Sequence, residues 1–355
     1  MKRYRLGKID PALFDKVIFP HLGAGRKDIK IGPRHGVDFG VVEIGNKAIV
    51  MSSDPVFIAP ALGWEKAAWF AIHILASDVA VSGIMPTHLC IDLNLPPEMS
   101  TQAFKLIWRT IHLECKKMGM AVVSGHTARY AGCNYPMVGG ATVFGIGNKK
   151  DLKNPANVMP GDKIVISKGP AIETTGLMSV QFPEFLHEKY GANFVKKAQD
   201  IFYSMSTVRD AYIASKISGT VCMHDATECG IWGGLYEMAN AGGWGFTVDK
   251  DAIPIEDVVK KTCEVFDIDP YKAISEGTLI AIARPNEADK LVFSLERAGI
   301  KASVVGDVTE KRNGMLVVRN GKKTRLKHPN KDPFWQQFEV FLQRQADRKK
   351  RGRKA

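Results

Sequence analysis

The sequence predicts an α+β protein of two domains, and three observations lead to this class. At 355 residues the chain is longer than a single core usually grows, so two domains of about 150 residues each are expected. The stretch 147–162, GNKKDLKNPANVMPGD, holds two prolines and two glycines, as is typical of a linker. Strand-like and helix-like segments mix on both sides of it, without a detectable repeat. An α+β pair of domains is therefore favoured over a doubly wound sheet.

The first half is expected to contain a hairpin, two helices and three further strands. Residues 39–54 hold two β-branched runs around a Gly-Asn-Lys turn, the pattern of a hairpin. Residues 63–83 are rich in alanine and apolar on all sides, as in a buried helix. An amphipathic helix is expected from Ser100 to Met118, opened by a Ser/Thr cap. The further strands are expected at Leu89–Leu95, at 120–127, where MAVVSGHT runs into a turn, and at 137–147.

The second half begins again with a strand, KIVISKG at 163–169, followed by helices from about 175 to 216. A turn, MHDATECG, is expected at 223–230, before a helix at 234–243 and a strand at 245–249. A strand, a helix and a strand are expected within 277–308. The predicted organisation is an N-terminal domain at 1–150, a C-terminal domain at 160–325, and a C-terminal helix with a basic tail at 326–355.

Composition limits the classes of function. With 45% hydrophobic and 24% charged residues, no apolar run of eighteen and no signal-like N-terminus, a cytoplasmic protein without membrane contact is expected. The net charge is +12, but residues 322–355 hold twelve Lys or Arg against three acids, so the rest of the chain is nearly neutral. Nucleic acid is therefore a possible partner only through the tail, which is equally consistent with a disordered solubilising extension.

The common nucleotide and thiol motifs are absent. Neither a P-loop nor the dinucleotide fingerprint is present, and the six cysteines form no Cys-x-x-Cys pair, which argues against a zinc cage and a disulfide scaffold. Cys222 and Cys229 flank an aspartate but are expected to be buried hydrophobes, and Cys133 is a slightly better candidate nucleophile. Trp232 and Trp244 are expected to pack in the core rather than to stack on bases.

What remains is a set of acids at the ends of predicted elements, each beside small residues. A buried, unpaired carboxylate is costly, so Asp78, within the apolar run LASDVAVSGIMP, needs a partner. Oxygen ligands from separate segments suit magnesium, which takes one or two carboxylates together with substrate phosphates. Taken singly, each acid is more often a strand end or a helix cap. The set comprises Asp38, Asp54, Asp78 and Asp225, with His126 at a further strand end.

Together and in order, these segments resemble the AIR synthetase-related (PurM-like) superfamily, and most closely its HypE branch of hydrogenase maturation proteins. SSDPVFIAP resembles the family's Thr-Asp-Ser strand end, and SDVAVSGIMP its Asn-Asp-Val-Ala-Val-Ser-Gly-Ala helix end. VVSGHT stands where the family has Gly-Asp-Thr, HDATECG where it has Asp-Ala-Thr-Arg-Gly-Gly, and AISEGTL where it has Asn-Glu-Gly-Lys-Leu. GVDFGVV is similar to the Gly-Asp-Asp-Ala-Ala-Val of thiamine phosphate kinases. The similarity spans about residues 30–310.

The resemblance implies a two-domain PurM-like fold in a homodimer, with strands of the N-terminal domain forming an intersubunit β-barrel beside a C-terminal α+β domain. It also implies ATP and Mg²⁺ as cofactors, held between the domains. Carried over motif by motif, it assigns metal binding to Asp38, Asp54, Asp78 and Asp225. It assigns catalytic roles to His126 and Asp78, and cofactor binding to Asp38, Asp54, Ser82, Gly83, Gly125 and Thr127.

Two departures from the family pattern shape the functional expectation. His126 replaces an expected carboxylate, so one hard ligand is missing, and a neutral imidazole is suited instead to bond phosphate or substrate. The HypE branch carries a C-terminal Pro-Arg-x-Cys whose thiol is the substrate, whereas no cysteine here follows Cys263, so self-modification of the tail is not expected.

The expected function is therefore ATP- and Mg²⁺-dependent phosphorylation of an amide, thioamide or acid oxygen, giving ADP or ADP plus phosphate. The acceptor is a small molecule or a protein-borne group. The alternative is a nucleotide-binding regulatory or RNA-associated protein that kept the fold and lost the chemistry.

Overall fold

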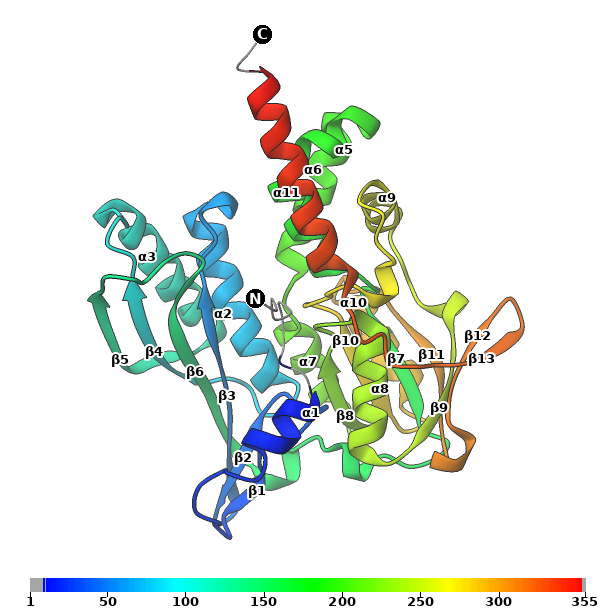
Figure 1. Cartoon of the computed structure of the whole chain (residues 1–355). Coiled ribbons are helices and arrows are strands. Elements are labelled where there is room, and N and C mark those ends of the chain that lie inside the picture. The colour runs from blue at the N-terminus through cyan, green and yellow to red at the C-terminus, as the bar shows by residue number, and fades with distance from the viewer. Residues whose placement is uncertain (1–8, 10, 353–355) are drawn as a thin grey trace.

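Two sheets, one in each half of the chain, organise the computed structural model, which describes residue 9 and residues 11–352 (Figure 1). The first sheet has the strand order β1-β2-β3-β6-β4-β5. Neighbouring strands are antiparallel except β4 and β5, which run parallel. The sheet is open in the single chain, with β1 and β5 at its edges. Its strands are β1 (Ile29–Ile31), β2 (Gly40–Ile44), β3 (Lys47–Phe57), β4 (His88–Leu95), β5 (Ala121–Arg129) and β6 (Met137–Asn148).

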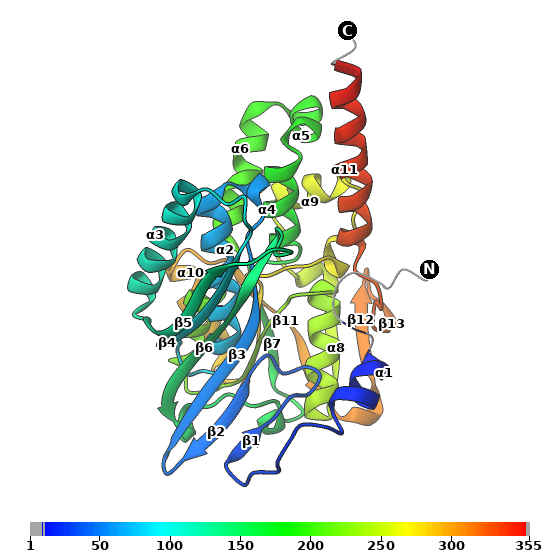
Figure 2. The same ribbon diagram turned by 60° about the vertical axis from the view of Figure 1, so that its left-hand side comes forward.

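Two long helices cover one face of the first sheet (Figure 2). Helix α2 (Trp64–Ala80) is buried along nearly its whole length because it lies between this sheet and the second half of the chain. Helix α3 (Thr101–Met118) is amphipathic, and Ser100 caps it by accepting a hydrogen bond from the backbone N–H of Ala103. A short helix α1 (Pro11–Leu13) and a π-helical turn η1 (Phe14–Ile18) precede the sheet. Helix α2 is therefore the element that connects the two halves.

The second sheet has seven strands in the order β13-β12-β9-β11-β7-β10-β8. It is covered by helices on both faces: α8 packs on one face, and α7 and α10 pack on the other. The side chains of β7 and β10 alternate accordingly. Ile164 and Ile280 join the core under α8, whereas Val165 and Ala281 join the other core. The strands are β7 (Lys163–Ser167), β8 (Thr220–Asp225), β9 (Gly245–Asp249), β10 (Leu279–Ala283), β11 (Ala302–Thr309), β12 (Met315–Arg319) and β13 (Lys322–Arg325).

The second half has eight α-helices among its described residues, and the last of them packs on an aromatic cluster. Phe338 and Phe341 of α11 lie 5.3 and 6.1 Å, between ring centroids, from fully buried Phe182. None of the helices in the described part of the chain is long and apolar enough to cross a membrane. The helices are α4 (Ile172–Gln181), α5 (Pro183–Tyr190), α6 (Ala192–Asp200), α7 (Val208–Ser215), α8 (Gly230–Gly242), α9 (Asp257–Val265), α10 (Ala288–Arg297) and α11 (Pro333–Gly352).

The elements that the sequence predicted occur in the expected order, with three differences, and the sequence did not predict β1, α9, β12 and β13. Strand β5 does not turn at His126 but continues to Arg129. Residues 223–225 end strand β8 instead of starting a turn, because they pair with Leu279, Ile280 and Ala281 of β10. Helix α8 begins at Gly230 rather than near 234. Residues 344–352, for which a disordered extension was considered, belong to α11; Arg348 pairs there with Glu188. Residues 353–355 of the predicted tail lie outside the described residues.

Candidate functional site

The four predicted aspartates converge where the two sheets meet across α2. Asp38 directly precedes β2, Asp54 is in β3, and Asp78 is in the last turn of α2. Asp225, the last residue of β8, comes from the second half. The negative charges of Asp225, Asp38 and Asp54 all act on the Asp78 carboxylate. Residues nearly 190 positions apart are thus brought together, as the order of the motifs predicted.

Asp78 is held in position by one hydrogen bond. The hydroxyl of Ser52 donates to Oδ2 of Asp78 at 2.7 Å, and both side chains are buried. Ser52 and Asp54 alternate with exposed positions along β3, so both face α2. Burial, followed by the charges of the neighbouring aspartates, raises the pKa of Asp78 well above its ordinary value. Without a cation, the neutral form of this carboxyl group is therefore favoured more strongly than in an exposed aspartate.

Two further buried carboxyl groups make no hydrogen bond. Asp225 is fully buried and Glu276, just before β10, is 1% exposed, yet none of their four oxygens has a hydrogen-bond partner among the described residues. Burial, with the charge of Asp38 second, raises the pKa of Asp225 to about 7. Burial and the charge of Asp225 likewise raise the pKa of Glu276. Unsatisfied buried oxygens of this kind are what a bound cation or donor would satisfy.

His224 supplies the positive charge that the site contains. Its Nδ1 lies 2.5 Å from Oδ2 of Asp38 and donates to it when the imidazole is charged. Burial opposes the charged form, but the charge of Asp38 and the hydrogen bond to it outweigh burial and raise the pKa of His224 to about 9. Ligand atoms of Asp38, His224 and Asp225 lie within 4.8 Å of one another. Because a protonated imidazole cannot ligate a metal, charged His224 pairs with Asp38, and the carboxylate oxygens are the groups that could ligate one.

The donor set fits magnesium better than a softer metal. Four carboxylates from four separate segments provide oxygen ligands only, and two of them, Asp78 and Asp225, are forced towards neutrality while no cation is present. All six cysteines are free thiols, and the four most buried of them behave as core residues. Burial raises the pKa of Cys222, the cysteine nearest to this cluster in sequence, so its thiol is inert.

A second group of acids continues from Glu276 towards the start of α11. Glu173, in the first turn of α4, accepts a hydrogen bond at 3.1 Å from the backbone N–H of Glu276. Burial raises the pKa of Glu173 to about 8 and that of Asp332 to about 6. Asp332 accepts hydrogen bonds from the backbone N–H groups of Cys229 and Phe334, which fixes the start of α11 to the loop before α8. A row of acidic groups, whose neutral forms are favoured by burial, thus lines one side of the site.

Glu173 gives a stability prediction with a definite sign. Its pKa is about 8 in the folded protein against 4.5 ordinarily, so unfolding releases a proton between these values and stability falls as pH rises from about 4.5 to 8. Because Gln mimics the protonated form, Glu173→Gln should be more stable than wild type at pH 8, by on the order of 2 kcal/mol, and equal to it at pH 4.5. Urea denaturation in EDTA at both pH values measures this. Glu264→Gln, at an exposed glutamate of α9, is the control; a pH-independent difference for Glu173→Gln would contradict the expectation.

His126, Gly125 and Thr127 are not brought to the aspartates within one chain. They lie on β5, three strands from Asp54 in the order β3-β6-β4-β5, or about 14 Å at the usual strand spacing. Strand pairing places Gly125 in line with Asp54, so the His126 side chain is on the opposite face of the sheet. There it lies 3.0 Å from the hydroxyl of Tyr130. Its assignment to the site stays a prediction that only a second subunit could satisfy.

Ser82 and Gly83 form the turn that ends α2, and their contacts are with the linker. The Ser82 hydroxyl bonds the backbone of Ile84, and its carbonyl accepts from the N–H of Lys153. Gly83 has φ +86°, and a Cβ at this position would lie 2.5 Å from the carbonyl oxygen of Asp151. The small residues of this motif thus let the linker pass close to α2. Their predicted part in cofactor binding stays untested.

The sequence interpretation missed His224, Glu276 and Glu173. His224 and Glu276 lie inside quoted motifs, next to Asp225 and Gly277, so position within a motif was an available signal. Glu173 had no local signal, because its place follows from the packing of α4 against the loop that precedes β10. Trp232 and Trp244 are buried in the core, as expected.

The fold and site together define an acid-lined, two-domain protein of PurM-like architecture. The model of the AIR synthase related protein N-terminal domain matches residues 36–150, and that of the C-terminal domain matches residues 159–319. The chain therefore belongs to the AIR synthase-related family, which confirms the family prediction. A putative hydrogenase expression/formation protein of Methanocaldococcus jannaschii is 24% identical over 88% of this chain and 91% of its own. Carbamoyl dehydratase HypE of Escherichia coli is 25% identical over 74% and 76%.

Solved structures share the fold. HypE of E. coli superposes with a TM-score of 0.69 at 22% identity, covering 80% of this chain and 87% of its own. A hydrogenase maturation protein HypE in complex with ATP gives a TM-score of 0.66 at 21% identity, covering 91% and 93%. The thiamine monophosphate kinase AaThiL, complexed with AMPPCP and TMP, gives 0.62 at 20% identity, covering 81% and 89%. The family thus includes enzymes that bind ATP or an ATP analogue.

Proposed function

We propose that the chain is an ATP- and Mg²⁺-dependent enzyme that phosphorylates an amide-, thioamide- or acid-type oxygen of an acceptor. The observation that carries the proposal is the pair of buried carboxyl groups at Asp78 and Asp225, which face each other from the two halves and are driven towards neutrality without a cation. A fold kept for structure alone would replace such groups with neutral ones, because they cost stability. The ATP complexes of relatives with the same fold support the nucleotide.

The side chains around the site would have separate roles in this reaction. Bound ATP and magnesium would supply the transferable phosphoryl group and the charge that neutralises it. Asp38, Asp54, Asp78 and Asp225 would hold the metal through carboxylate oxygens. Charged His224 keeps Asp38 ionised and oriented through the 2.5 Å contact. The unpaired oxygens of Glu276 are available to hydrogen-bond the acceptor.

Acceptor-dependent turnover is the direct test. Purified protein is incubated with Mg²⁺ and ATP, with and without pools of amides, thioamides and carboxylates whose oxygen is labelled with oxygen-18. We expect ADP release that needs both Mg²⁺ and an acceptor, with the label in inorganic phosphate or in a phosphorylated product. ATP binding without turnover against any pool, combined with RNA binding that depends on α11 and falls steeply with salt, would instead support the regulatory alternative.

The same proposal includes a homodimer formed through the first sheet. Strand β5 is an edge strand whose residues are almost all exposed, including Val122 at 41% and Val123 at 51%, and uncovered edges of this kind favour pairing. We expect light scattering at micromolar concentration to give twice 39.1 kDa. Val123→Lys should shift the population to monomer, while Val340→Lys, at an equally apolar exposed site on α11, should not. A monomeric wild type would contradict this part of the proposal.

A further inference from the structure

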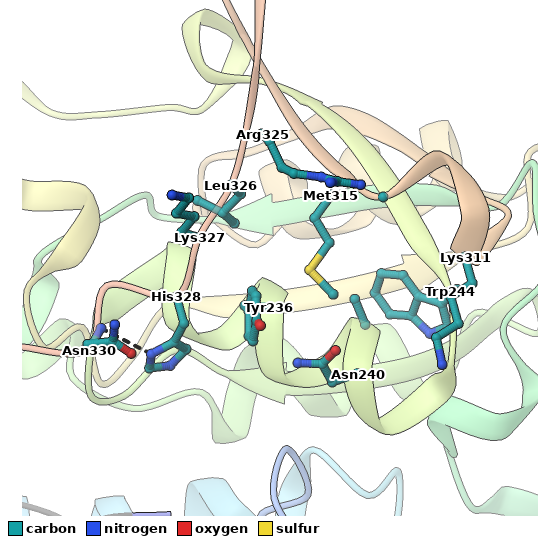
Figure 3. Close-up of a pocket in the computed structure, with 12 residues that line it drawn as sticks. Tyr236, Asn240, Trp244, Lys311, Met315, Arg325, Leu326, Lys327, His328 and Asn330 are labelled. Carbon is teal, nitrogen blue, oxygen red and sulfur yellow. Dashed lines mark hydrogen bonds between the residues drawn. The ribbon is translucent and has the colours of Figure 1, made fainter.

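A pocket separate from the acidic site lies in the C-terminal domain, between α8 and the strands β12 and β13 (Figure 3). Its volume is about 480 Å³, within the range of sites for small molecules. Figure 3 shows Tyr236 and Asn240 of α8 on one side, with Trp244 at one end of that side. Arg325, Met315, Leu326 and Lys327 lie opposite, and His328 and Asn330 lie beside Tyr236 at the other end. None of its lining residues belongs to the aspartate cluster.

The ionised side chains that line the pocket are all positively charged. Lys311, Arg325 and Lys327 line it from three separate positions of the chain, and no carboxylate is among the lining residues. Within the described residues, none of these three cations forms an ion pair. The acids nearest in sequence are paired: Glu310 with Arg312, and Asp307 with Lys163. Glu237, next to Tyr236, pairs with His328 of the lining. The positive charge around the pocket is therefore available to an anion.

The walls of the pocket are fixed by backbone contacts. Gly314 has φ +72°, and a Cβ there would lie 2.8 Å from a terminal nitrogen of Arg325, so glycine allows the guanidinium to lie against the backbone. The N–H of Leu326 donates to the carbonyl of Met315 at 2.8 Å, and the N–H of Phe246 donates to that of Gly314 at 3.1 Å. The cations thus extend from a rigid frame rather than from a loose loop.

Aromatic and neutral polar groups complete the lining. The buried ring of Trp244 closes one end, and Tyr236 packs edge-on against His328, with ring centroids 5.2 Å apart. The amide of Asn240 and the hydroxyl of Tyr236 make no hydrogen bond to another described residue and are free to orient a ligand. Three cations match a doubly charged phosphate better than a single carboxylate, and flat rings favour a flat partner.

We propose that this pocket is a second ligand site, for a small organic phosphate that carries a flat ring. Arg325 binds the phosphate oxygens through its paired N–H donors, and Lys327 adds positive charge from the other end of the pocket. Trp244 and Tyr236 contact the ring. The proposal is independent of the chemistry assigned to the aspartates, because it uses a different set of residues and no metal.

Calorimetric titration with phenyl phosphate in EDTA tests it, because EDTA leaves the acidic site without the cation that phosphate would need there. We expect one phenyl phosphate per chain, bound more tightly than inorganic phosphate or benzoate. Arg325→Gln should weaken binding about tenfold or more, since it removes charge-assisted hydrogen bonds to the phosphate. Lys327→Gln should weaken binding less, since it removes only a nearby positive charge. Lys322→Gln, a lysine of β13 outside the pocket, is the matched control and should bind as wild type does.

Three results would overturn the proposal. The first is no binding by wild type at millimolar phenyl phosphate. The second is equal weakening in all three variants, or loss of binding in Asp78→Asn, which would place the anion at the acidic site or on the general surface. The third is binding of a heparin tetrasaccharide through Arg325 and Lys327 without binding of phenyl phosphate, which would make the surface a polyanion contact. Thermal melting of each variant confirms that it is folded.

Discussion

Asp225→Asn should reduce Mg²⁺- and ATP-dependent turnover by about a hundredfold or more while leaving the metal-free protein folded. The side chain of Asp225 is fully buried, its two oxygens have no hydrogen-bond partner among the described residues, and burial raises its pKa to about 7. Asn keeps the size and removes only the charge. The only opposite charge near it is that of His224, within 4.8 Å, and burial outweighs this attraction, so stability at pH 8 should be equal or higher. Steady-state kinetics and thermal melting measure the two effects.

Asp162→Asn is the matched control, because it makes the same substitution at a buried aspartate whose charge is fully paired. Asp162 is 2% exposed and accepts hydrogen bonds from Arg284 at 2.7 and 2.9 Å and from the N–H of Met159 at 2.8 Å. Its replacement should cost about 3–5 kcal/mol of stability, with or without Mg²⁺, and leave metal affinity unchanged. If Asp225→Asn destabilised the protein as Asp162→Asn does and kept its activity, Asp225 would be structural.

The sequence alone was sufficient to identify the four aspartates as candidate site residues, because each lies in a short motif at the end of an element. Asp54 follows a β-branched run, and Asp78 ends an apolar helix; both features are local and survive in a single sequence. The order of the motifs then identified the family and, through it, the meeting of the two halves. Composition alone predicted neither the family nor the candidate site, since the net positive charge is concentrated near the C-terminus, away from these aspartates in the sequence.

The face of β5 could not be predicted, for a geometric reason. The pairing of β4 with β5 shifts register between Leu89 and Cys90, and a shift of one residue moves every later side chain to the opposite face. A motif comparison aligns His126 with the family motif, but it does not show which face of the sheet the side chain takes after such a bulge. The helix at 344–352 could also not be predicted from the local sequence. The stability of α11 depends on Phe182 and Phe185, which contact Phe341 from more than 150 residues away.

Asp78→Asn is expected to uncouple the stability of the protein from ATP and Mg²⁺. In wild type the buried carboxyl group is costly until a cation binds, so ligand and metal should stabilise the fold together, by about 2.7 kcal/mol at a hundredfold excess over the dissociation constant. Asn removes the charge but retains an oxygen that accepts the hydrogen bond from Ser52, so the metal-free variant should be as stable as wild type or slightly more stable. Most of the shift produced by ATP with Mg²⁺ should be lost.

Melting both proteins with nothing, with Mg²⁺, with ATP and with both separates the metal role from a structural one. If Asp78 serves only to accept the Ser52 hydroxyl, Asn should alter stability by the same amount under all four conditions, because the 2.7 Å contact does not involve a ligand. Ser52→Ala is the complementary variant: it removes the donor and leaves the charge. It should raise the pKa of Asp78 further and weaken Mg²⁺ binding modestly, while still allowing the combined shift. An equal ATP-plus-Mg²⁺ shift in wild type and Asp78→Asn would rule out Asp78 as a metal ligand, because a group whose charge is irrelevant to binding cannot hold the cation.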